Sequence, residues 1–187
     1  MSAWLGFDPT PYTPEEWWTH LKSIPDSAMT WDPVGIVLHA TGAPTLGQWV
    51  EFGPENIQRL RNLEAYYQGM GWLHGPHCFT SRSHVNGFSA ITSRGTHSQC
   101  YNYTHFGMEQ AGNFNTGHDD YNSGDGAMVK ASAVLGLAAL CKRFGLKPTS
   151  IIPHASCKID GHFQCPGNEV SMDEIISKTA AAMLTLQ

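Results

Sequence analysis

The stretch GIVLHATG, residues 35–42, decides the fold of this chain. Its aliphatic run predicts a buried β-strand that delivers the imidazole of His39 at its carboxyl end, and Ala-Thr-Gly then turns the chain away. A second short β-branched run, at residues 151–153, is followed at once by His154. Further on, Cys165 stands in the turn sequence Cys-Pro-Gly. Each of these three side chains is therefore expected to point inward from a strand or a turn.

His39, His154 and Cys165 are residue types that bind a soft metal ion. Two imidazoles and one thiolate leave a tetrahedral zinc one ligand short, and catalytic zinc sites keep that fourth position for water. The pattern suggests a zinc hydrolase, and its spacing does not match the paired CxxC of a zinc finger. The alternative is an ordinary hydrogen-bonded histidine at a strand end, since the chain has ten histidines and five cysteines.

Composition bounds the other possibilities. The 187 residues, 41% of them apolar, suit one compact domain. A net charge of −5, from 11 basic and 16 acidic side chains, argues against a nucleic-acid partner, because a phosphate backbone calls for a clustered basic face. The longest apolar stretch, residues 131–141, is too short to span a bilayer, and no basic-then-apolar signal segment opens the chain. We therefore expect synthesis in the cytoplasm without a signal peptide or transmembrane segment.

The five cysteines are expected to be reduced thiols rather than a disulfide framework, because their number is odd and no secretory signal precedes them. Cys78, Cys100 and Cys141 are interpreted as small buried apolar residues. Cys157 lies three residues after His154 and is left open as a competing metal ligand.

Helical and strand patterns alternate along the chain. Helices are predicted after the capping box Thr13-Pro14-Glu15-Glu16, over about 55–67, over about 127–144, and after Ser171. A hairpin is predicted at Asn86-Gly87, between strands at 79–81 and 88–92, and a further strand at 106–110. This order predicts an α/β fold: a single domain with a central mixed β-sheet flanked by α-helices. Residues 1–33 are expected to form an N-terminal extension with a short helix packed on the main domain, residues 34–187.

Between residues 34 and 170 several motifs follow one another in a definite order. They are His39-Ala40-Thr41, then Gly71-Trp72 through Gly75-Pro76-His77 and Phe79, Gly95-Thr96-His97-Ser98 with Asn102, Phe106-Gly107-Met108-Glu109, and His154 some ten residues before Cys165-Pro166-Gly167. In their order and spacing they resemble the zinc-dependent N-acetylmuramoyl-L-alanine amidases (amidase type 2), which include phage endolysins and the peptidoglycan recognition proteins. The run at residues 43–49 is similar to endolysins of phages and prophages of Gram-negative bacteria.

The resemblance implies roles for particular residues. His39, His154 and Cys165 would hold one Zn²⁺ ion, and residues 34–187 would be a catalytic zinc amidase domain. Glu109 would be the general base that takes a proton from water and passes it to the leaving amine. The residues themselves support this role, because a carboxylate in an apolar strand is costly to bury without a purpose. The alternative is that Glu109 faces solvent from an edge strand.

One position departs from the family pattern. Many relatives carry a lysine two residues before the third ligand, where this chain has Phe163, which cannot donate a hydrogen bond to an oxyanion. His162, next to it, is the candidate donor, and Lys158 is a second candidate. His77 matches a region where relatives place an active-site residue, so it is a candidate for lining the cleft.

Aromatic residues suggest a surface for the substrate. Trp72 is the candidate substrate-binding residue, and Trp49, Tyr66 and Tyr67 are further candidates for stacking on sugar rings. The alternative is a place in the core, where aromatic residues are found more often, and helical spacing favours it for Tyr67.

The expected function is that of an endolysin-like peptidoglycan hydrolase. It would cleave the amide between N-acetylmuramic acid and the L-alanine of the stem peptide by zinc-activated water. Two alternatives stay open: a non-catalytic peptidoglycan-binding or sensing protein on the same fold, and a cysteine hydrolase that uses Cys165 with His154. We expect a monomer that acts on the cell wall or periplasm after release by phage lysis machinery.

Overall fold

The computed structural model describes residues 4, 6–8, 10–51 and 53–187. Its strands are β1 (Pro11–Tyr12), β2 (Gly35–Ala40), β3 (Cys78–Thr80), β4 (Val85–Gly87), β5 (His105–Gln110) and β6 (Ile151–Pro153). Its α-helices are α1 (Pro14–Ser23), α2 (Gly53–Gly69), α3 (Gly124–Phe144) and α4 (Met172–Thr185). Short 3₁₀ turns at Asp26–Ala28, Leu46–Gln48, Pro148–Ser150 and His154–Ser156 connect them.

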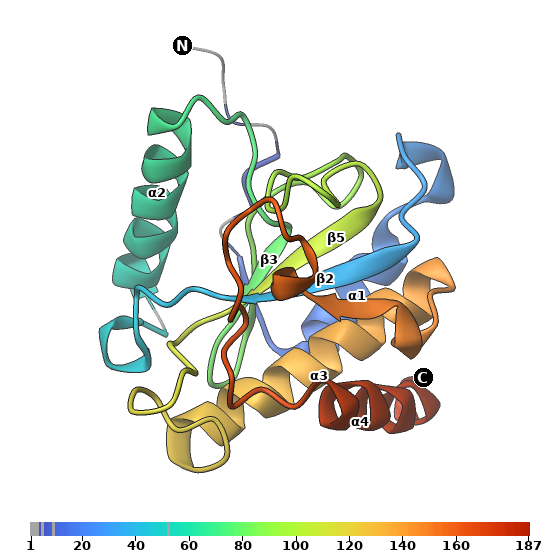
Figure 1. Ribbon diagram of the computed structural model, residues 1–187. Coiled ribbons are helices and arrows are strands. Elements are labelled where there is room, and N and C mark those ends of the chain that lie inside the picture. The colour runs from blue at the N-terminus through green and yellow to red at the C-terminus, as the bar shows by residue number, and fades with distance from the viewer. Residues whose placement is uncertain (1–3, 5, 9, 52) are drawn as a thin grey trace.

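The strands of the described residues form one mixed sheet in the order β1-β4-β3-β5-β2-β6. β3, β5, β2 and β6 run parallel, while β4 is antiparallel to both β1 and β3. Figure 1 shows the strands at the centre, α2 at one side, and α3 and α4 together at another. The prediction of a single α/β domain with a mixed sheet flanked by helices is therefore confirmed.

The two faces of the sheet differ in chemistry because successive side chains of a strand point to opposite sides. Ile36 and Leu38 of β2 and Phe106 and Met108 of β5 belong to the main core cluster, which α3 covers. The alternate residues of these strands point to the other face of the sheet. They include His39 of β2 and Glu109 of β5, which lie opposite each other in the strand pairing. The same alternation that builds the core thus places polar side chains on the opposite face.

Helix α2 covers part of that second face. Its Leu60, Leu63 and Tyr67 pack with Phe79 of β3 and with Phe88 in a smaller core cluster. Phe79 lies opposite Glu109 in the pairing of β3 with β5. The smaller cluster therefore ends beside Glu109 and His39, which with His97 form the polar row on this face of the sheet.

Helix α3 accounts for the longest apolar region of the chain. By length and composition it would be able to cross a membrane, with a mean hydropathy of 1.3 in its most apolar window, but 67% of that window is buried inside the protein. Burial in the core explains this composition. The helix ends at Gly145, which has a φ of 66°, as glycine after a helix commonly does.

The described part of the N-terminal segment is integrated into the fold. Thr13 and Glu16 form the predicted capping box at the start of α1. Trp17 and Leu21 of α1 are buried in the main core cluster, and β1 extends the sheet beside β4. The domain boundary at residue 33 stays a prediction.

The predicted hairpin was placed wrongly. Asn86 and Gly87 lie inside β4, and the turn lies at residues 81–84. The buried Asn86 side chain donates to the Phe79 carbonyl and to Ser81 Oγ, so it is an internal sheet residue and not a turn residue. A Cβ at Gly87 would lie 2.7 Å from Asp8 Oδ2 and 3.0 Å from the Asp8 carbonyl oxygen, so a larger residue there would displace Asp8.

The expectation of five reduced thiols was also wrong. Cys100 and Cys157 form a disulfide with Cα atoms 5.6 Å apart, whereas Cys78, Cys141 and Cys165 are free. An odd number of cysteines does not exclude one pair, and the two partners lie 57 residues apart in the sequence. Cys157 is therefore not available as a competing metal ligand in the oxidised protein.

We expect the double substitution Cys100→Ser and Cys157→Ser to lower the free energy of unfolding by roughly 2–4 kcal/mol, because it opens a long covalent loop. Urea denaturation monitored by circular dichroism measures the change. A phosphine reductant acting on the unsubstituted protein should produce a similar loss. Unchanged stability in both cases would mean that packing alone holds the two segments together.

Candidate metal centre

His39, His154 and Cys165 meet at one end of the sheet. Their ligand atoms all lie within 4.8 Å of one another. β2 pairs with β6 so that Leu38 lies opposite Pro153, and a histidine follows each of these two residues in the chain. The two ring centroids are 4.3 Å apart. The structure thus brings together the three predicted ligands.

Cys165 reaches this place through the loop that follows His154. The backbone N–H of Ala155 donates to the Cys165 carbonyl over 2.9 Å, which closes the loop onto the residue after the histidine. The thiol lies 4.0 Å from the Ala40 carbonyl, at the end of β2. In the metal-free protein, burial is the main cause that raises the pKa of Cys165 to about 12.

Hydrogen bonds determine which nitrogen of His39 is free. His97 Nε2 lies 3.0 Å from the His105 carbonyl, which can only accept, so Nε2 carries the proton. Burial lowers the pKa of His97 to about 3, so the ring is neutral and its Nδ1 accepts. That Nδ1 lies 3.1 Å from His39 Nε2, which must therefore donate. The lone pair of His39 is left on Nδ1.

His154 is held in the same way from the other side. Its Nε2 lies 2.8 Å from Asp160 Oδ2. Although burial raises the pKa of Asp160, the hydrogen bonds from Ser98 and His154 lower it more, so its pKa lies below the usual value and the group is a carboxylate. The carboxylate accepts, so His154 Nε2 donates and its Nδ1 carries the lone pair. A carboxylate or carbonyl on the far ring nitrogen is the usual support of a metal-binding histidine.

The donor set fits one zinc ion. Two imidazole nitrogens with free lone pairs and one thiol sulfur are ligands that zinc prefers, and their number leaves one tetrahedral position for a reactant. The residues present therefore suit a catalytic rather than a structural zinc.

Glu109 lies beside this group. It pairs with His39 across the strands, and its Oε1 is 3.9 Å from His39 Nδ1. β5 is an inner strand between β3 and β2, so the edge-strand alternative does not hold. The side chain is buried, and among the described residues its Oε2 has no hydrogen-bond partner. Burial raises the pKa of Glu109 to about 8.

The group opens into a cavity of about 1070 Å³. Its walls come from the end of β2, from α2 and from the loop around Cys165. The lining includes His39, Tyr66, Tyr67, Trp72, Glu109, His154, His162, Phe163 and Cys165. Tyr66 and Phe163 are 62% and 65% exposed, which makes them free to contact a ligand. None of the described lining residues is a lysine or an arginine.

A family model described as N-acetylmuramoyl-L-alanine amidase matches residues 29–168. The chain belongs to this family. No protein among the curated sequences matches it. Membership supports hydrolysis or binding of peptidoglycan as the general function of the chain.

Solved structures with the same fold resemble this chain at low sequence identity. The endolysin N-acetylmuramoyl-L-alanine amidase LysCS from Clostridium intestinale is 18% identical, with a TM-score of 0.59 over 96% of this chain and 91% of that one. A mutant of Drosophila PGRP-LB in complex with tracheal cytotoxin is 16% identical, with a TM-score of 0.61 over 92% and 88%. Staphylococcus aureus hydrolase AmiA in complex with its ligand is 14% identical, with a TM-score of 0.59 over 82% and 74%.

Several residues of this amidase-family chain do not lie where the sequence interpretation placed them. His77 is fully buried: it stacks on Trp31 at 5.4 Å, and its Nδ1 accepts from the Gly107 N–H while its Nε2 donates to the Ser93 carbonyl. It is absent from the cavity wall, as are Lys158, which donates to the Ala155 carbonyl, and Trp49, which packs on Phe79. His77 therefore supports the sheet.

His162 and Trp72, in contrast, do lie at the cavity of the amidase-family chain. The His162 ring stacks on the His154 ring, with centroids 4.8 Å apart. Trp72 stacks on Tyr67 at 5.1 Å, with the two planes only 7° apart. Both side chains are therefore in position to contact a ligand.

Two supporting residues were missed. They are His97, which lies in one of the quoted motifs, and Asp160. The glycine at position 107 is the sequence signal for His97. The His97 ring packs against this residue of β5, and a Cβ on Gly107 would lie 2.5 Å from His97 Cγ. No local sequence pattern predicts the role of Asp160, because its contact with His154 forms only when the loop between them folds back.

We expect Glu109→Gln to raise the free energy of unfolding of the metal-free amidase-family chain by about 1–3 kcal/mol at neutral pH. Burial raises the pKa of Glu109 to about 8, so its carboxyl group must take up a proton on folding, and glutamine does not. Urea denaturation in the presence of a chelator measures this. Glu15→Gln, in the exposed first turn of α1, is the control and should lower stability by at most about 0.3–1 kcal/mol, because it removes a charge that favours the helix N-terminus. A loss of stability in Glu109→Gln would show that the carboxylate has a stabilising partner.

Proposed function

We propose that this chain is a zinc-dependent N-acetylmuramoyl-L-alanine amidase that hydrolyses the bond between N-acetylmuramic acid and the L-alanine of the stem peptide. One observation carries the proposal. A buried carboxylate with a free oxygen lies 3.9 Å from one of three converging metal-type ligands, at the bottom of an open cavity. A structural metal site would have no use for an unpaired buried carboxylate.

His39, His154 and Cys165 would hold the zinc. When bound there, zinc supplies a Lewis acid that polarises the scissile carbonyl and lowers the pKa of a nearby water. Glu109 accepts the proton of the attacking water at its free carboxylate oxygen and passes it to the leaving amine of L-alanine. Because β5 is an inner strand, Glu109 is fixed in position while it does so.

The developing oxyanion needs a donor, and Phe163 offers none. We assign this role to His162, which lines the cavity and stacks on His154 beside the ligand group. A preorganised donor of this kind typically contributes about 3–4 kcal/mol to catalysis. Lys158, the second candidate, is turned to the Ala155 carbonyl.

The substrate proposed for this cavity is a muropeptide. The cavity, with a volume of about 1070 Å³, has room for a ligand of several sugar or amino-acid residues. The exposed Tyr66 and the stacked Trp72 provide flat apolar surfaces for sugar rings or for the peptide backbone. The similar PGRP-LB structure contains tracheal cytotoxin, a muropeptide, which supports this substrate class.

We further propose that the chain acts as an endolysin of phage or prophage origin, on the cell wall after release by phage lysis machinery. The similarity to the Clostridium endolysin supports this role. So does the disulfide between Cys100 and Cys157, because disulfides persist in oxidising compartments such as the periplasm and are rare in the cytosol.

The other two functions are less well supported by the geometry. A cysteine hydrolase needs a thiolate nucleophile, whereas burial raises the pKa of Cys165, and it gives His39 no task. A non-catalytic binding protein needs no buried base, yet Glu109 is buried beside His39, and its Oε2 has no hydrogen-bond partner in the part of the chain that the structure describes.

Digestion of purified Gram-negative sacculi is expected to release stem peptides that begin with L-alanine. Chelation should abolish the release and added zinc should restore it, because the proposed site depends on the metal. Mass spectrometry of the soluble products identifies the bond that is cut. Zinc-loaded, folded protein that binds sacculi without releasing peptide would favour the binding function, and release that survives chelation would favour the cysteine hydrolase.

Glu109→Gln is expected to lower kcat by about 10²–10⁴-fold, because it removes the proton acceptor while keeping the shape of the side chain. KM and zinc content should change little. The rate of peptide release from sacculi measures the effect, with Glu15→Gln as the matched exposed control. Activity within a few fold of the unsubstituted protein would remove Glu109 from the mechanism.

A further inference from the structure

One loop of the described chain contacts the supports of both imidazole ligands. It comprises residues 97–102, between the hairpin and β5, and we call it the support loop. His97 at its start accepts the hydrogen bond of His39. Ser98, the next residue, donates from Oγ to Asp160 Oδ2 over 2.7 Å, and the same oxygen accepts from His154. A shift of this loop therefore acts on His39 and His154 together.

The support loop is itself tightly organised around two polar side chains. Asn102 Oδ1 accepts from the backbone N–H groups of His97 and Ser98, both over 2.7 Å. The backbone N–H of Gln99 donates to the Asp160 carboxylate, 3.1 Å from Oδ2 and 3.2 Å from Oδ1. The Asp160 side chain is only 6% exposed. Loop and carboxylate thus form one hydrogen-bonded unit.

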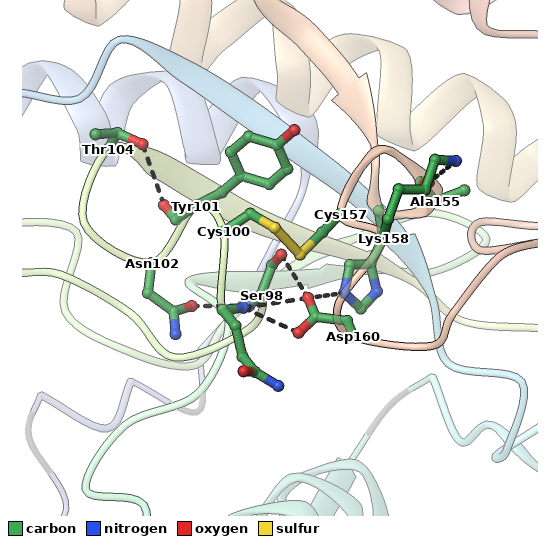
Figure 2. Close-up of a disulfide and its surroundings, with 11 residues drawn as sticks. Ser98, Cys100, Tyr101, Asn102, Thr104, Ala155, Cys157, Lys158 and Asp160 are labelled. Carbon is green, nitrogen blue, oxygen red and sulfur yellow. Dashed lines mark hydrogen bonds and ion pairs between the residues drawn. A yellow bond between two sulfur atoms is a disulfide. The ribbon is translucent and has the colours of Figure 1, made fainter.

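A covalent bond joins this unit to the segment that carries the second histidine. Cys100 lies in the support loop, and Cys157 lies between His154 and Asp160. Figure 2 shows the disulfide beside the cluster of Ser98, Asn102 and Asp160. Cys100 is exposed at the surface while Cys157 is buried, so a reductant has access from the loop side.

We propose that the Cys100–Cys157 disulfide and the Ser98–Asp160 pair position the two imidazole ligands, and that the redox state of this disulfide sets the affinity of the protein for zinc. The inference rests on the proposed metal site, because it assigns a purpose to residues around that site. None of the four residues touches the substrate cavity, so they are positioning residues.

The redox step is a thiol–disulfide exchange. In the reduced chain, the two thiols give up two protons and two electrons to a disulfide of a partner protein or small molecule, which becomes a pair of thiols. The S–S bond then forms between Cys100 and Cys157 and closes the support loop onto the His154 segment. The chain would bind zinc weakly in a reducing cytoplasm and tightly after it reaches an oxidising compartment.

The test measures the dissociation constant for Zn²⁺ by competition with a chromogenic chelator. Asp160→Asn is expected to weaken zinc binding about 10–100-fold, the usual effect of removing a support of a metal-binding histidine. Ser98→Ala keeps both the charge and the disulfide and should weaken binding by a smaller factor. The double substitution Cys100→Ser and Cys157→Ser should weaken it as well, and a phosphine reductant should reproduce that loss in the unsubstituted chain.

Two controls separate positioning from a general loss of structure. Asp173→Asn removes an exposed carboxylate of α4 and should leave zinc affinity unchanged. Long-range ¹⁵N spectra of the metal-free protein should show the proton of His154 on Nε2, and in Asp160→Asn a mixture of both tautomers. Thermal unfolding of each metal-free variant verifies that it is folded. If the cysteine variant does not fold, the reduced unsubstituted protein tests the redox part of the proposal, and Ser98→Ala and Asp160→Asn test the positioning part.

Equal zinc affinity within twofold in Asp160→Asn, Ser98→Ala and the reduced protein would overturn this inference and leave the proposed function standing. Weakened affinity in these variants, together with absence of amidase products from the zinc-loaded protein, would support the inference while removing the proposed reaction. An unsubstituted chain that binds no zinc would overturn both.

Discussion

The parallel pairing of β2 with both β5 and β6 is the constraint on which the site depends. On one side it sets His39 opposite Glu109, and on the other it sets Leu38 opposite Pro153, so that two histidines leave neighbouring strands at the same level. Parallel strands present their carboxyl ends at one edge of a sheet, and loops extend from that edge. A slip of one residue in either pairing would turn the polar side chains into the core under α3.

The polar row survives in a largely apolar interior because its members satisfy one another. The His105 carbonyl, His97 and His39 form a chain in which each hydrogen bond fixes the direction of the next. Asp160 does the same for His154. Glu109 is the exception, because its Oε2 has no partner among the described residues. Burial of this group costs stability, a cost that proteins commonly bear where activity requires it.

Sequence reasoning recovered the features that depend on local pattern or on family motifs. The aliphatic run before His39 predicted β2 and the capping box predicted α1. The order of helices and strands predicted the mixed sheet, and the order of the motifs predicted the family. All four are confirmed. The hairpin failed because Asn-Gly is a strong turn signal only when the side chain is not needed elsewhere, and here Asn86 bonds across the sheet. The disulfide, Asp160 and the buried place of His77 depend on segments brought together by folding, which no local spacing reveals.

Gly107 has no side chain, and the His97 ring packs against β5 in the space that a side chain would fill. Any larger residue there would push the imidazole away from His39, because interiors leave no room for an added Cβ at such distances. The glycine two positions before the carboxylate is therefore a diagnostic for comparing homologous chains. A homologue that carries alanine or valine at this position must hold its first imidazole by some other acceptor, and the identity of that one strand residue is enough to tell the two arrangements apart.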